Sequence, residues 1–386
     1  MPKLRIREIG EVFDGPHATP KRREEGKYFL NISSLRNGRL ILDESDFIDD
    51  EDFQRWTRRV TPRENDLLFS YETRLGEAAL MPPDIDAALG RRMALLRPNP
   101  EVVDPTFLLY YWLSPKWQQK IAQNTLYGAT VNRLPITTLP NWEITLPELK
   151  VQRPIGRTLA SLDDKISANS RVIQYSAQLS ITLVNKAMTK EFENLTNLAD
   201  ITMGSSPKGE FLNEEGIGEP FFQGVRDFGE LFPSERVFAE KAVRTAQEGD
   251  ILFAVRAPIG EVNIAERPCV IGRGIAAIRS KQSHLGLFYL LKGHPELWET
   301  YQSSGTVFAG INKSDLHNAV IPVLRDSDKL EQQLTPIHER AMHALRENQA
   351  LARTRDELLP LLMSGRITVG EAEEVANVAG TAAWES

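Results

Sequence analysis

An internal duplication constrains the fold of this chain more than any other feature of its sequence. The first matched pair of blocks is ENDLLFSYETRLGEA at residues 64–78 with EGDILFAVRAPIGEV at residues 248–262. Three further pairs follow in the same order: residues 90–97 with 272–279, 107–117 with 287–298, and 127–147 with 304–322. Because these blocks recur collinearly with a period of about 180 residues, the sequence predicts two similar domains rather than a solenoid of short repeats.

Each repeat has the pattern of small mixed sheets followed by helices. Short runs of strand-forming residues, such as LLFSY at 67–71 and ILFAVR at 251–256, are separated by Gly, Pro, Asn and Asp, which favour turns. This pattern indicates small mixed sheets rather than a doubly wound parallel sheet. A short helix is expected over residues 107–123 and again over residues 287–302.

A long amphipathic helix closes each repeat. Apolar or small residues recur at alternating steps of three and four, which is the spacing of a coiled-coil seam. The seam residues of the first helix are Ile155, Leu159, Leu162, Ile166, Ile173, Leu183 and Ala187. Those of the second are Leu330, Leu334, Ile337, Ala341, Ala344, Leu351, Leu358 and Leu362. Since one small domain cannot bury so long a stripe, we expect the two helices to pack antiparallel on each other.

Polar residues and prolines interrupt these helical patterns. Asn169 and Asn348 fall on the two seams, where each either sets the register as a buried residue or faces solvent where the seam loosens. Pro154 and Pro336 are expected near the helix starts, where a missing N–H costs nothing. Pro360 is expected to kink or end the second helix.

The overall composition excludes a protein that coats nucleic acid through bulk charge. The formal net charge is -7, although Lys and Arg outnumber acids over the first forty residues. The single cysteine, Cys269, excludes a disulfide framework and a cysteine-based zinc site. The chain starts without an apolar leader and lacks a run of eighteen apolar residues, so we expect a cytoplasmic protein that does not bind membranes.

The motifs of common enzymes are absent from the sequence. There is no GxxxxGK[ST] loop, no strand-linked GxGxxG and no GxSxG. His338 and His343 are five residues apart, which turns them to different faces of a helix, and both are interpreted as helix-surface residues rather than zinc ligands. The chain is therefore expected to be neither an enzyme nor a cofactor-binding protein.

Several strings nevertheless resemble a known family. DGPHATPKRREEGKYFLNISSLRNGRL, YGATVNRLP and VQRPIGRTLASLDDKISAN are similar to the specificity subunits of type I restriction-modification systems, and the similarity continues through the second repeat to LLPLLMSGRI. The resemblance implies a non-catalytic reader of double-stranded DNA. It further implies partners, namely two methyltransferase subunits that carry S-adenosylmethionine and restriction or translocase subunits that use ATP and Mg.

The expected fold class is α+β. Two similar mixed α/β target-recognition domains, related by an approximate two-fold axis, would be separated by two long antiparallel coiled-coil helices. The expected boundaries are 1–150 for the first domain, 151–192 for the central helix, 193–325 for the second domain, 326–370 for the second helix and 371–386 for a flexible tail. The second repeat opens with a less basic sequence, so the two domains are expected to read different half-sites.

Candidate DNA contacts are long cations, which reach phosphates, and Arg and Asn side chains, which can read guanine and adenine, together with His and Thr residues of the same loops. In the first domain they are His17, Thr19, Lys21, Arg22, Arg23, Arg74, Thr130, Asn132 and Arg133. In the second domain the matching positions are taken to be Lys208, Arg256, Thr306, Asn312 and Lys313. Any one of them could instead be an ordinary surface charge or a turn-forming residue. Arg91 and Arg273 also align, but both lead into an apolar strand and could be structural.

Two other functions remain open from the sequence. The chain could be the same kind of DNA reader in another modification or phage-defence complex. It could also be a duplicated protein–protein scaffold without DNA contact, which the acidic net charge favours. The target sequence cannot be read from the chain, because base preference also depends on loop geometry and DNA deformability.

Overall fold

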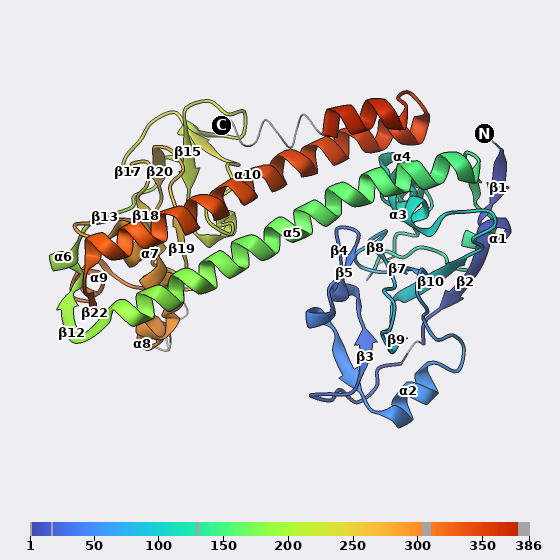
Figure 1. Cartoon of the computed structure of the whole chain (residues 1–386), viewed down its shortest axis with the longest axis horizontal. Coiled ribbons are helices and arrows are strands. Elements are labelled where there is room, and N and C mark those ends of the chain that lie inside the picture. Colours follow the sequence, from blue (N-terminus) through green and yellow to red (C-terminus); the bar gives the residue numbers. More distant parts are fainter. Residues whose placement is uncertain (1, 17, 129–130, 303–309, 377–386) are drawn as a thin grey trace. The chain divides into compact units, whose positions relative to one another are not determined.

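The computed structural model describes residues 2–16, 18–128, 131–302 and 310–376 (Figure 1). Its contacts divide the chain into two compact units. Unit 1 contains Met1–Ile166 together with Gln349–Ser386, and unit 2 contains Ser167–Asn348. Each unit therefore includes part of both long helices.

Unit 1 is built on a four-stranded antiparallel sheet with the order β2-β10-β7-β8. Its strands are β2 (Gly10–Asp14), β10 (Met93–Pro98), β7 (Leu67–Ser70) and β8 (Ala78–Leu80). Every residue of β7 is buried, as the apolar run LLFS predicts for a strand covered on both faces. One of these faces packs on α3 (Pro105–Leu113), where the ring centroids of Phe69 and Trp112 are 4.6 Å apart.

A second sheet of unit 1 has the order β6-β3-β9. In it β3 (Lys27–Leu30) pairs antiparallel with β6 (Asp46–Ile48) and parallel with β9 (Ala87–Leu89). Two-stranded pairs join β1 (Lys3–Arg5) to β11 (Glu143–Thr145) and β4 (Leu35–Arg36) to β5 (Arg39–Leu40). The remaining short helices are α1 (Ile6–Ile9), α2 (Asp50–Trp56) and α4 (Pro115–Gln123).

Unit 2 repeats this topology, which confirms the duplication. Its antiparallel sheet has the order β13-β21-β18-β19, with β13 (Ala199–Met203), β21 (Ile275–Ser280), β18 (Ile251–Ala254) and β19 (Val262–Ile264). A parallel pair of β15 (Glu219–Phe222) and β20 (Cys269–Ile271) corresponds to β3 and β9. Two ion pairs of buried aspartates also correspond, because Arg97 binds Asp66 at 2.7 Å in unit 1 and Arg279 binds Asp250 at 2.6 Å in unit 2.

The other elements of unit 2 complete the resemblance to unit 1. The parallel pair lies in a five-stranded sheet of order β14-β16-β15-β20-β17, with β14 (Leu212–Asn213), β16 (Phe238–Ala239) and β17 (Thr245–Ala246). β12 (Met188–Asn194) pairs with β22 (Val320–Leu324), as β1 does with β11. The short helices are α6 (Leu195–Leu198), α7 (His284–Gly293), α8 (Glu299–Gln302) and α9 (Lys313–His317).

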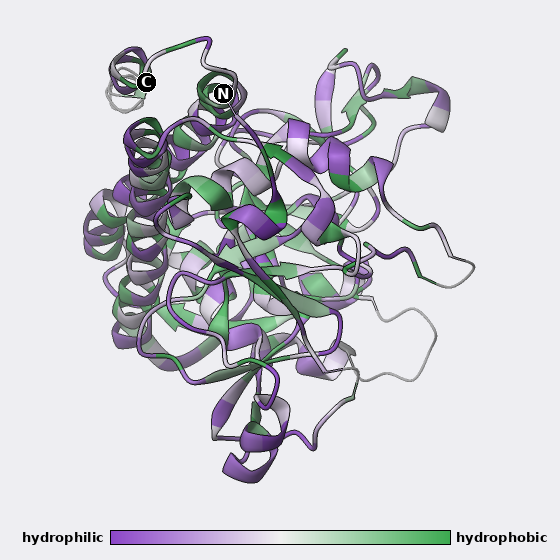
Figure 2. Ribbon diagram, turned by 90° about the vertical axis from the view of Figure 1, so that its right-hand side faces the viewer, coloured by the Kyte–Doolittle hydropathy of each residue, from purple (hydrophilic) through white to green (hydrophobic). Residues whose placement is uncertain are grey.

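The two long helices are α5 (Leu149–Ala187) and α10 (Ser327–Ser364). Within unit 2 they run antiparallel, since the end of α5 meets the start of α10, where Arg325 N donates to Ala187 O, while Asn169 lies beside Glu347. Both helices alternate polar and apolar residues around their turns (Figure 2). The predicted fold class, two mixed α/β domains with long antiparallel helices, is thus confirmed.

The predicted seam residues lie in the cores of the two units, with one exception. Leu159, Leu162, Leu351 and Leu358 are buried in the core of unit 1, and Ile166 packs at its border. Ile173 and Leu334 are buried in the core of unit 2. Ile337, by contrast, is only half-buried and stands outside that core, because the next residue, His338, occupies the inward position of α10.

His338 is not a helix-surface residue, which corrects the prediction for the first of the two histidines. Its side chain is buried and its Nδ1 lies 2.9 Å from the Tyr289 hydroxyl on α7. Burial lowers the pKa of His338 to about 4, with a smaller contribution from His284. A neutral ring in this position is a packing residue of the core.

Both seam asparagines make contacts between the helices, which decides between the two alternatives that the sequence left open. Asn169 is buried, and its Nδ2 donates to Glu347 Oε2 at 2.7 Å. Asn348 Nδ2 donates to Ser170 Oγ at 3.2 Å. A polar layer of this kind restricts the register of a helix pair, because other registers would leave its groups unpaired.

The prolines and the C-terminal region differ from expectation. Pro154 and Pro336 lie inside α5 and α10 rather than in their first turns, and α10 continues past Pro360 to Ser364. The helix ends at Gly365, whose φ of 70° allows Arg366 N and Gly365 N to donate back to Leu361 O and Leu362 O. The expected flexible tail is helical over its described part, residues 371–376, with Ala372 buried.

Candidate nucleic-acid interface

In unit 1 the loops that contain the predicted contacts meet at one end of the four-stranded sheet. β2 ends, β10 begins and β7 ends at this side, because neighbouring strands are antiparallel. Gly15 N donates to Met93 O at 3.0 Å, and Tyr71 N donates to Arg92 O at 3.1 Å. We call this group of loops, residues 15–16, 18–26, 71–77, 90–92, 124–128 and 131–134, the loop edge of unit 1.

The last of these loops is tied to the second by its backbone. Leu134 N donates to Tyr71 O at 2.8 Å, and Glu72 and Arg133 form an isolated β-bridge. The predicted residues Asn132 and Arg133 therefore lie beside the turn that carries Arg74, although about sixty residues separate them in sequence.

Several of the predicted cations already have acidic partners. Arg22 Nε lies 3.1 Å from Asp46, and Arg23 Nη2 lies 2.6 Å from Asp49. The pKa of Asp49 is lowered mainly by the Asp52 N–H and next by Arg23. These arginines are exposed, so their ion pairs are weak, and a phosphate could replace the carboxylate at little cost.

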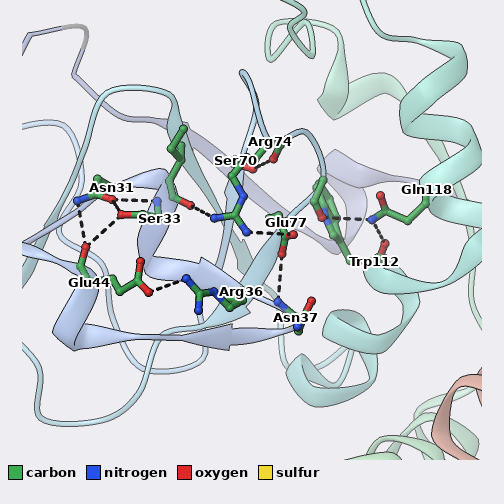
Figure 3. A network of polar contacts seen from close by, with 12 residues as sticks. Asn31, Ser33, Arg36, Asn37, Glu44, Ser70, Arg74, Glu77, Trp112 and Gln118 are labelled. Atoms are coloured by element: carbon green, nitrogen blue, oxygen red, sulfur yellow. Dashed lines mark hydrogen bonds and ion pairs between the residues drawn. The ribbon is translucent and has the colours of Figure 1, made fainter. Parts of the chain in front are cut away.

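Arg74 has a structural position rather than a free one. Its Nη1 donates to Ile32 O at 3.2 Å, and its Nη2 donates to Glu77 at 3.3 Å (Figure 3). Glu77 also accepts a hydrogen bond from Asn37 N at 3.2 Å. Arg74 and Glu77 thus tie their own turn to residues 32–37, and two nitrogens of the Arg74 guanidinium are hydrogen-bonded within the fold.

Further hydrogen bonds of the network drawn in Figure 3 hold the segments that support the loop edge. Asn31 caps a short 3-10 helix through Ser33 N and donates to Glu44 O at 3.3 Å. Trp112 Nε1 and Gln118 Nε2 both donate to Gly76 O at 3.2 Å (Figure 3). Loops held by many hydrogen bonds present their side chains with little loss of entropy on binding.

A shallow hollow opens at this edge, with a volume of about 490 Å³. It brings the predicted Thr19 and Arg22 together with Arg91 and Arg92, which come from the turn before β10. Lys21, Asn132 and Arg133 are exposed on the loops. The predicted His17 and Thr130 lie outside the described residues.

The sequence-based selection missed Arg92. It has a φ of 76°, its Nε lies 3.2 Å from Glu72, and it lines the same hollow as Arg22. The pair of arginines in GRR was visible in the sequence, but its place next to the residue 15–26 loop depends on sheet pairing. Arg92 also links two loops of the edge through Glu72.

Unit 2 has the corresponding loop edge, formed by residues 204–211, 255–261, 272–274 and the described part of the loop that ends at Asn312. Gly204 N donates to Ile275 O, and Ile311 N donates to Val255 O, both at 2.9 Å. These bonds correspond to those of Gly15 and Leu134 in unit 1.

The backbone bonds correct two of the predicted matches between the repeats. Arg256 bridges Gly310 as Glu72 bridges Arg133, so Arg256 corresponds to Glu72 and not to Arg74. Gly310, rather than Lys313, then corresponds to Arg133. The match of Glu72 with Arg256 already follows from the aligned blocks 64–78 and 248–262. The match of Arg133 does not, because the loops before Leu134 and Ile311 differ in length.

The predicted residues of unit 2 occupy different environments. Arg256 and Lys313 are exposed, and Lys208 lies 3.9 Å from Glu210 at the surface. Asn312 is the N-cap of α9, where its Oδ1 accepts from Asp315 N at 2.9 Å, so it has the structural role that was its alternative. Thr306 lies outside the described residues.

The described residues contain no cluster of three or more His, Cys, Asp or Glu side chains that could hold a metal ion. Cys269 is buried in β20, and burial raises the pKa of its thiol to about 12. Among the helices of the described residues, none has the length and apolar character that crossing a bilayer requires. The chemistry that this surface offers is hydrogen bonding and charge.

Comparison with known proteins shows which family this chain resembles. The family described as "Type I restriction modification DNA specificity domain" matches residues 2–174 and 189–329, one match for each repeat. A putative type I restriction enzyme MjaX specificity subunit of Methanocaldococcus jannaschii is 27% identical over 408 residues, which cover 94% of this chain and 93% of that protein.

Two solved structures are also similar to this chain. The S subunit of a type I restriction-modification system from M. genitalium is 17% identical, with a TM-score of 0.61 over 94% of this chain and 96% of that one. The HsdS subunit from Thermoanaerobacter tengcongensis is 25% identical, with a TM-score of 0.38 over 95% and 97% of the two chains. The first of these supports the fold alone.

The family match covers both repeats, and the repeats have the same strand order and the same kind of loop edge. The chain belongs to the family of type I restriction modification DNA specificity domains, whose members are the non-catalytic subunits that give these systems their DNA recognition.

Proposed function

We propose that this chain reads a split, asymmetric site in double-stranded DNA, with each unit reading one half through its loop edge. The observation that carries this proposal is the recurrence of one loop edge on two equivalent sheets with different side chains. Glu72 and Arg133 in unit 1 correspond to Arg256 and Gly310 in unit 2. Because base recognition depends on the hydrogen-bonding groups presented, unlike edges read unlike sequences.

Under this proposal most of the predicted residues contact DNA, and two of them support the loops. Lys21, Arg22, Arg23 and Arg133 contact phosphates of the first half-site, and Asn132 and Thr19 are available to bases. Lys208, Arg256 and Lys313 act on the second half-site. Arg74 and Asn312 support the loops, because their polar groups are held by Ile32, Glu77 and Asp315.

The long helices are proposed to dock two methyltransferase subunits. Support comes from apolar side chains on the surface of α5: Tyr175 and Leu179 are 62% and 50% exposed and lie four residues apart, on one face of the helix. S-adenosylmethionine, ATP and Mg then belong to the methyltransferase and restriction subunits, and this chain acts in the cytoplasm without a cofactor of its own.

We further propose that residues 1–150 and 193–325 are the exchangeable recognition segments and that the helices set the gap between the half-sites. α5 and α10 each pass from one unit into the other without a break, which favours this role. In dimeric DNA readers the spacing of half-sites likewise follows the spacing of the reading elements.

The decisive experiment is to map methylated positions in DNA from a strain that carries this chain and its modification partner. We expect a motif with two unequal parts and an unspecified gap, methylated in both parts. A continuous palindrome, or methylation that does not depend on this chain, would contradict the proposal.

A segment exchange tests the division of labour between the units. Replacing residues 198–325 with the equivalent segment of another specificity subunit is expected to change one half of the motif and leave the other half and the gap unchanged. The matched control replaces residues 1–150 and is expected to change the opposite half. A change of both halves in either chimera would contradict independent reading.

A further inference from the structure

The turn that leads into the central strand of each four-stranded sheet has the same construction in both units. In unit 1 Met93 N donates to Gly90 O at 3.2 Å, and in unit 2 Ile275 N donates to Gly272 O at 3.0 Å. Arg91 and Arg273 each follow the first residue of this turn. The two arginines therefore have the same place in their units.

Each turn is fixed against the neighbouring parallel strand. Gly90 N donates to Leu30 O at 2.6 Å, and Gly272 N donates to Phe222 O at 2.9 Å. A Cβ at position 90 would collide with Leu30 O, and a Cβ at position 272 would come within 2.7 Å of the Gln223 side chain. At position 90 only glycine allows this approach, and at position 272 a side chain would have to displace Gln223. The backbone before each arginine is thus held at the loop edge by its hydrogen bond to the neighbouring strand.

The position of Arg91 and Arg273 has the same residue in both units, whereas neighbouring positions of the two loop edges differ in charge or size. Glu72 corresponds to Arg256, and Arg133 corresponds to Gly310, as the β-bridges show. By the same turn bonds, Arg92 corresponds to Gly274. A residue that stays the same while its neighbours change suits a feature common to both half-sites, and the phosphate backbone is such a feature.

The electrostatic surroundings also suit a phosphate. Arg91 and Arg273 are both exposed. Within the part of the chain that the structure describes, neither guanidinium has a carboxylate at ion-pairing distance, in contrast to Arg22 with its Asp46 partner. Binding a phosphate would therefore not require either arginine to give up an existing ion pair.

We propose that Arg91 and Arg273 are equivalent phosphate anchors, one in each unit, that position the loop edges on the duplex without reading its bases. This inference rests on the proposed function, since it assigns roles within the same surface. Each anchor would bind a phosphate from the same place in its unit. The other loop residues of both units would then lie at the same distance from the DNA backbone, although the two half-sites differ in sequence.

The test uses the full chain assembled with its modification partner and a duplex that contains the mapped motif, with a scrambled duplex in parallel. Dissociation constants are measured by fluorescence anisotropy over a range of salt concentrations for Arg91→Ala, Arg273→Ala and the double variant. Arg91→Lys keeps the charge. Arg63→Ala is the matched control, because Arg63 is an exposed cation at the opposite end of β7.

Each alanine variant is expected to bind both duplexes about tenfold more weakly, as for the loss of one charge-assisted hydrogen bond. The slope of log K against log salt should decrease by about 0.9 for each lost phosphate contact. Arg91→Lys should keep most of the slope, the control should bind like the wild type, and the methylated motif should stay the same.

Two results would overturn the inference. One is an altered base at any position of the motif in Arg91→Ala or Arg273→Ala, which would make the residue a base reader. The other is an unchanged dissociation constant and salt slope in both variants. Failure of the proposed function is seen separately, because the unmodified complex would then bind neither duplex in a salt-dependent way.

Discussion

The polar contact between Asn169 and Glu347 provides the sharpest test of how the two long helices are held together. Asn169 is 2% exposed and Glu347 is 4% exposed, and 2.7 Å separates Asn169 Nδ2 from Glu347 Oε2. The perturbation is a double-mutant cycle with Asn169→Leu and Glu347→Met. These changes keep the approximate shape of each side chain while removing its polar atoms.

The two single variants should have unequal costs. Asn169→Leu leaves a buried carboxylate without this charge-assisted bond, which should cost about 3 kcal/mol. Glu347→Met leaves a neutral amide unsatisfied, which should cost about 2 kcal/mol. The double variant should cost about 1 kcal/mol or less, because an apolar pair fits a seam that is otherwise apolar, so the expected coupling is about 4 kcal/mol.

The assay is native-state hydrogen exchange of the full chain, read by mass spectrometry at peptides from residues 167–187 and 327–348. It reports the free energy of opening for this part of the helix pair without assuming that the whole chain unfolds in one step. Peptides from residues 64–98 in unit 1 serve as an internal reference and should not change.

Additive costs would refute this reasoning. If the double variant opened as easily as the sum of the single variants predicts, Asn169 and Glu347 would stabilise the helices independently of each other. The reasoning would also be contradicted if Glu347→Met lowered the free energy of opening more than Asn169→Leu does. Loss of the hydrogen bond would then be less costly for the buried carboxylate than for the amide.

Three further predictions concern the stability of the units. Leu334→Ala should destabilise unit 2 by about 3 kcal/mol in urea denaturation, because Leu334 is fully buried, whereas Ile337→Ala should cost about 1 kcal/mol or less. Because burial lowers the pKa of His338 to about 4, its contribution to stability should be complete above about pH 6.5 and be lost as the pH falls toward 4, and thermal unfolding of His338→Gln should lack this loss. Asp66→Ala should cost about 3 kcal/mol, since buried Asp66 accepts both Arg97 bonds, and unchanged thermal unfolding would contradict this.

Much of the fold follows from local patterns and could be predicted. The collinear blocks predicted two equivalent domains, and the steps of three and four predicted both long helices. The helix ends were less well predicted. Gly365 ends α10 through backbone bonds to Leu361 and Leu362, while Pro360 lies within the helix, because a proline near a helix end interrupts only one bond of the ladder.

The candidate interface was predicted only in part. Lys21, Arg133 and Arg256 are exposed on the loop edges, as a DNA contact requires. The same residue-type argument predicts Arg74 and Asn312, and the structure shows that they also hold a loop and a helix end. Residue type states what a side chain can bind, while the partner that it finds depends on segments far away in sequence.

The sequence by itself determined that the chain is a duplicated mixed α/β protein with two long paired helices and without a known catalytic motif. Repeats and helical periodicity are local properties, so they can be read before the chain folds. The tertiary structure alone decided that Arg74 and Asn312 are held within their own units, and that Gly310 rather than Lys313 corresponds to Arg133. Such equivalence depends on strand register, and register arises only when distant backbone segments exchange hydrogen bonds.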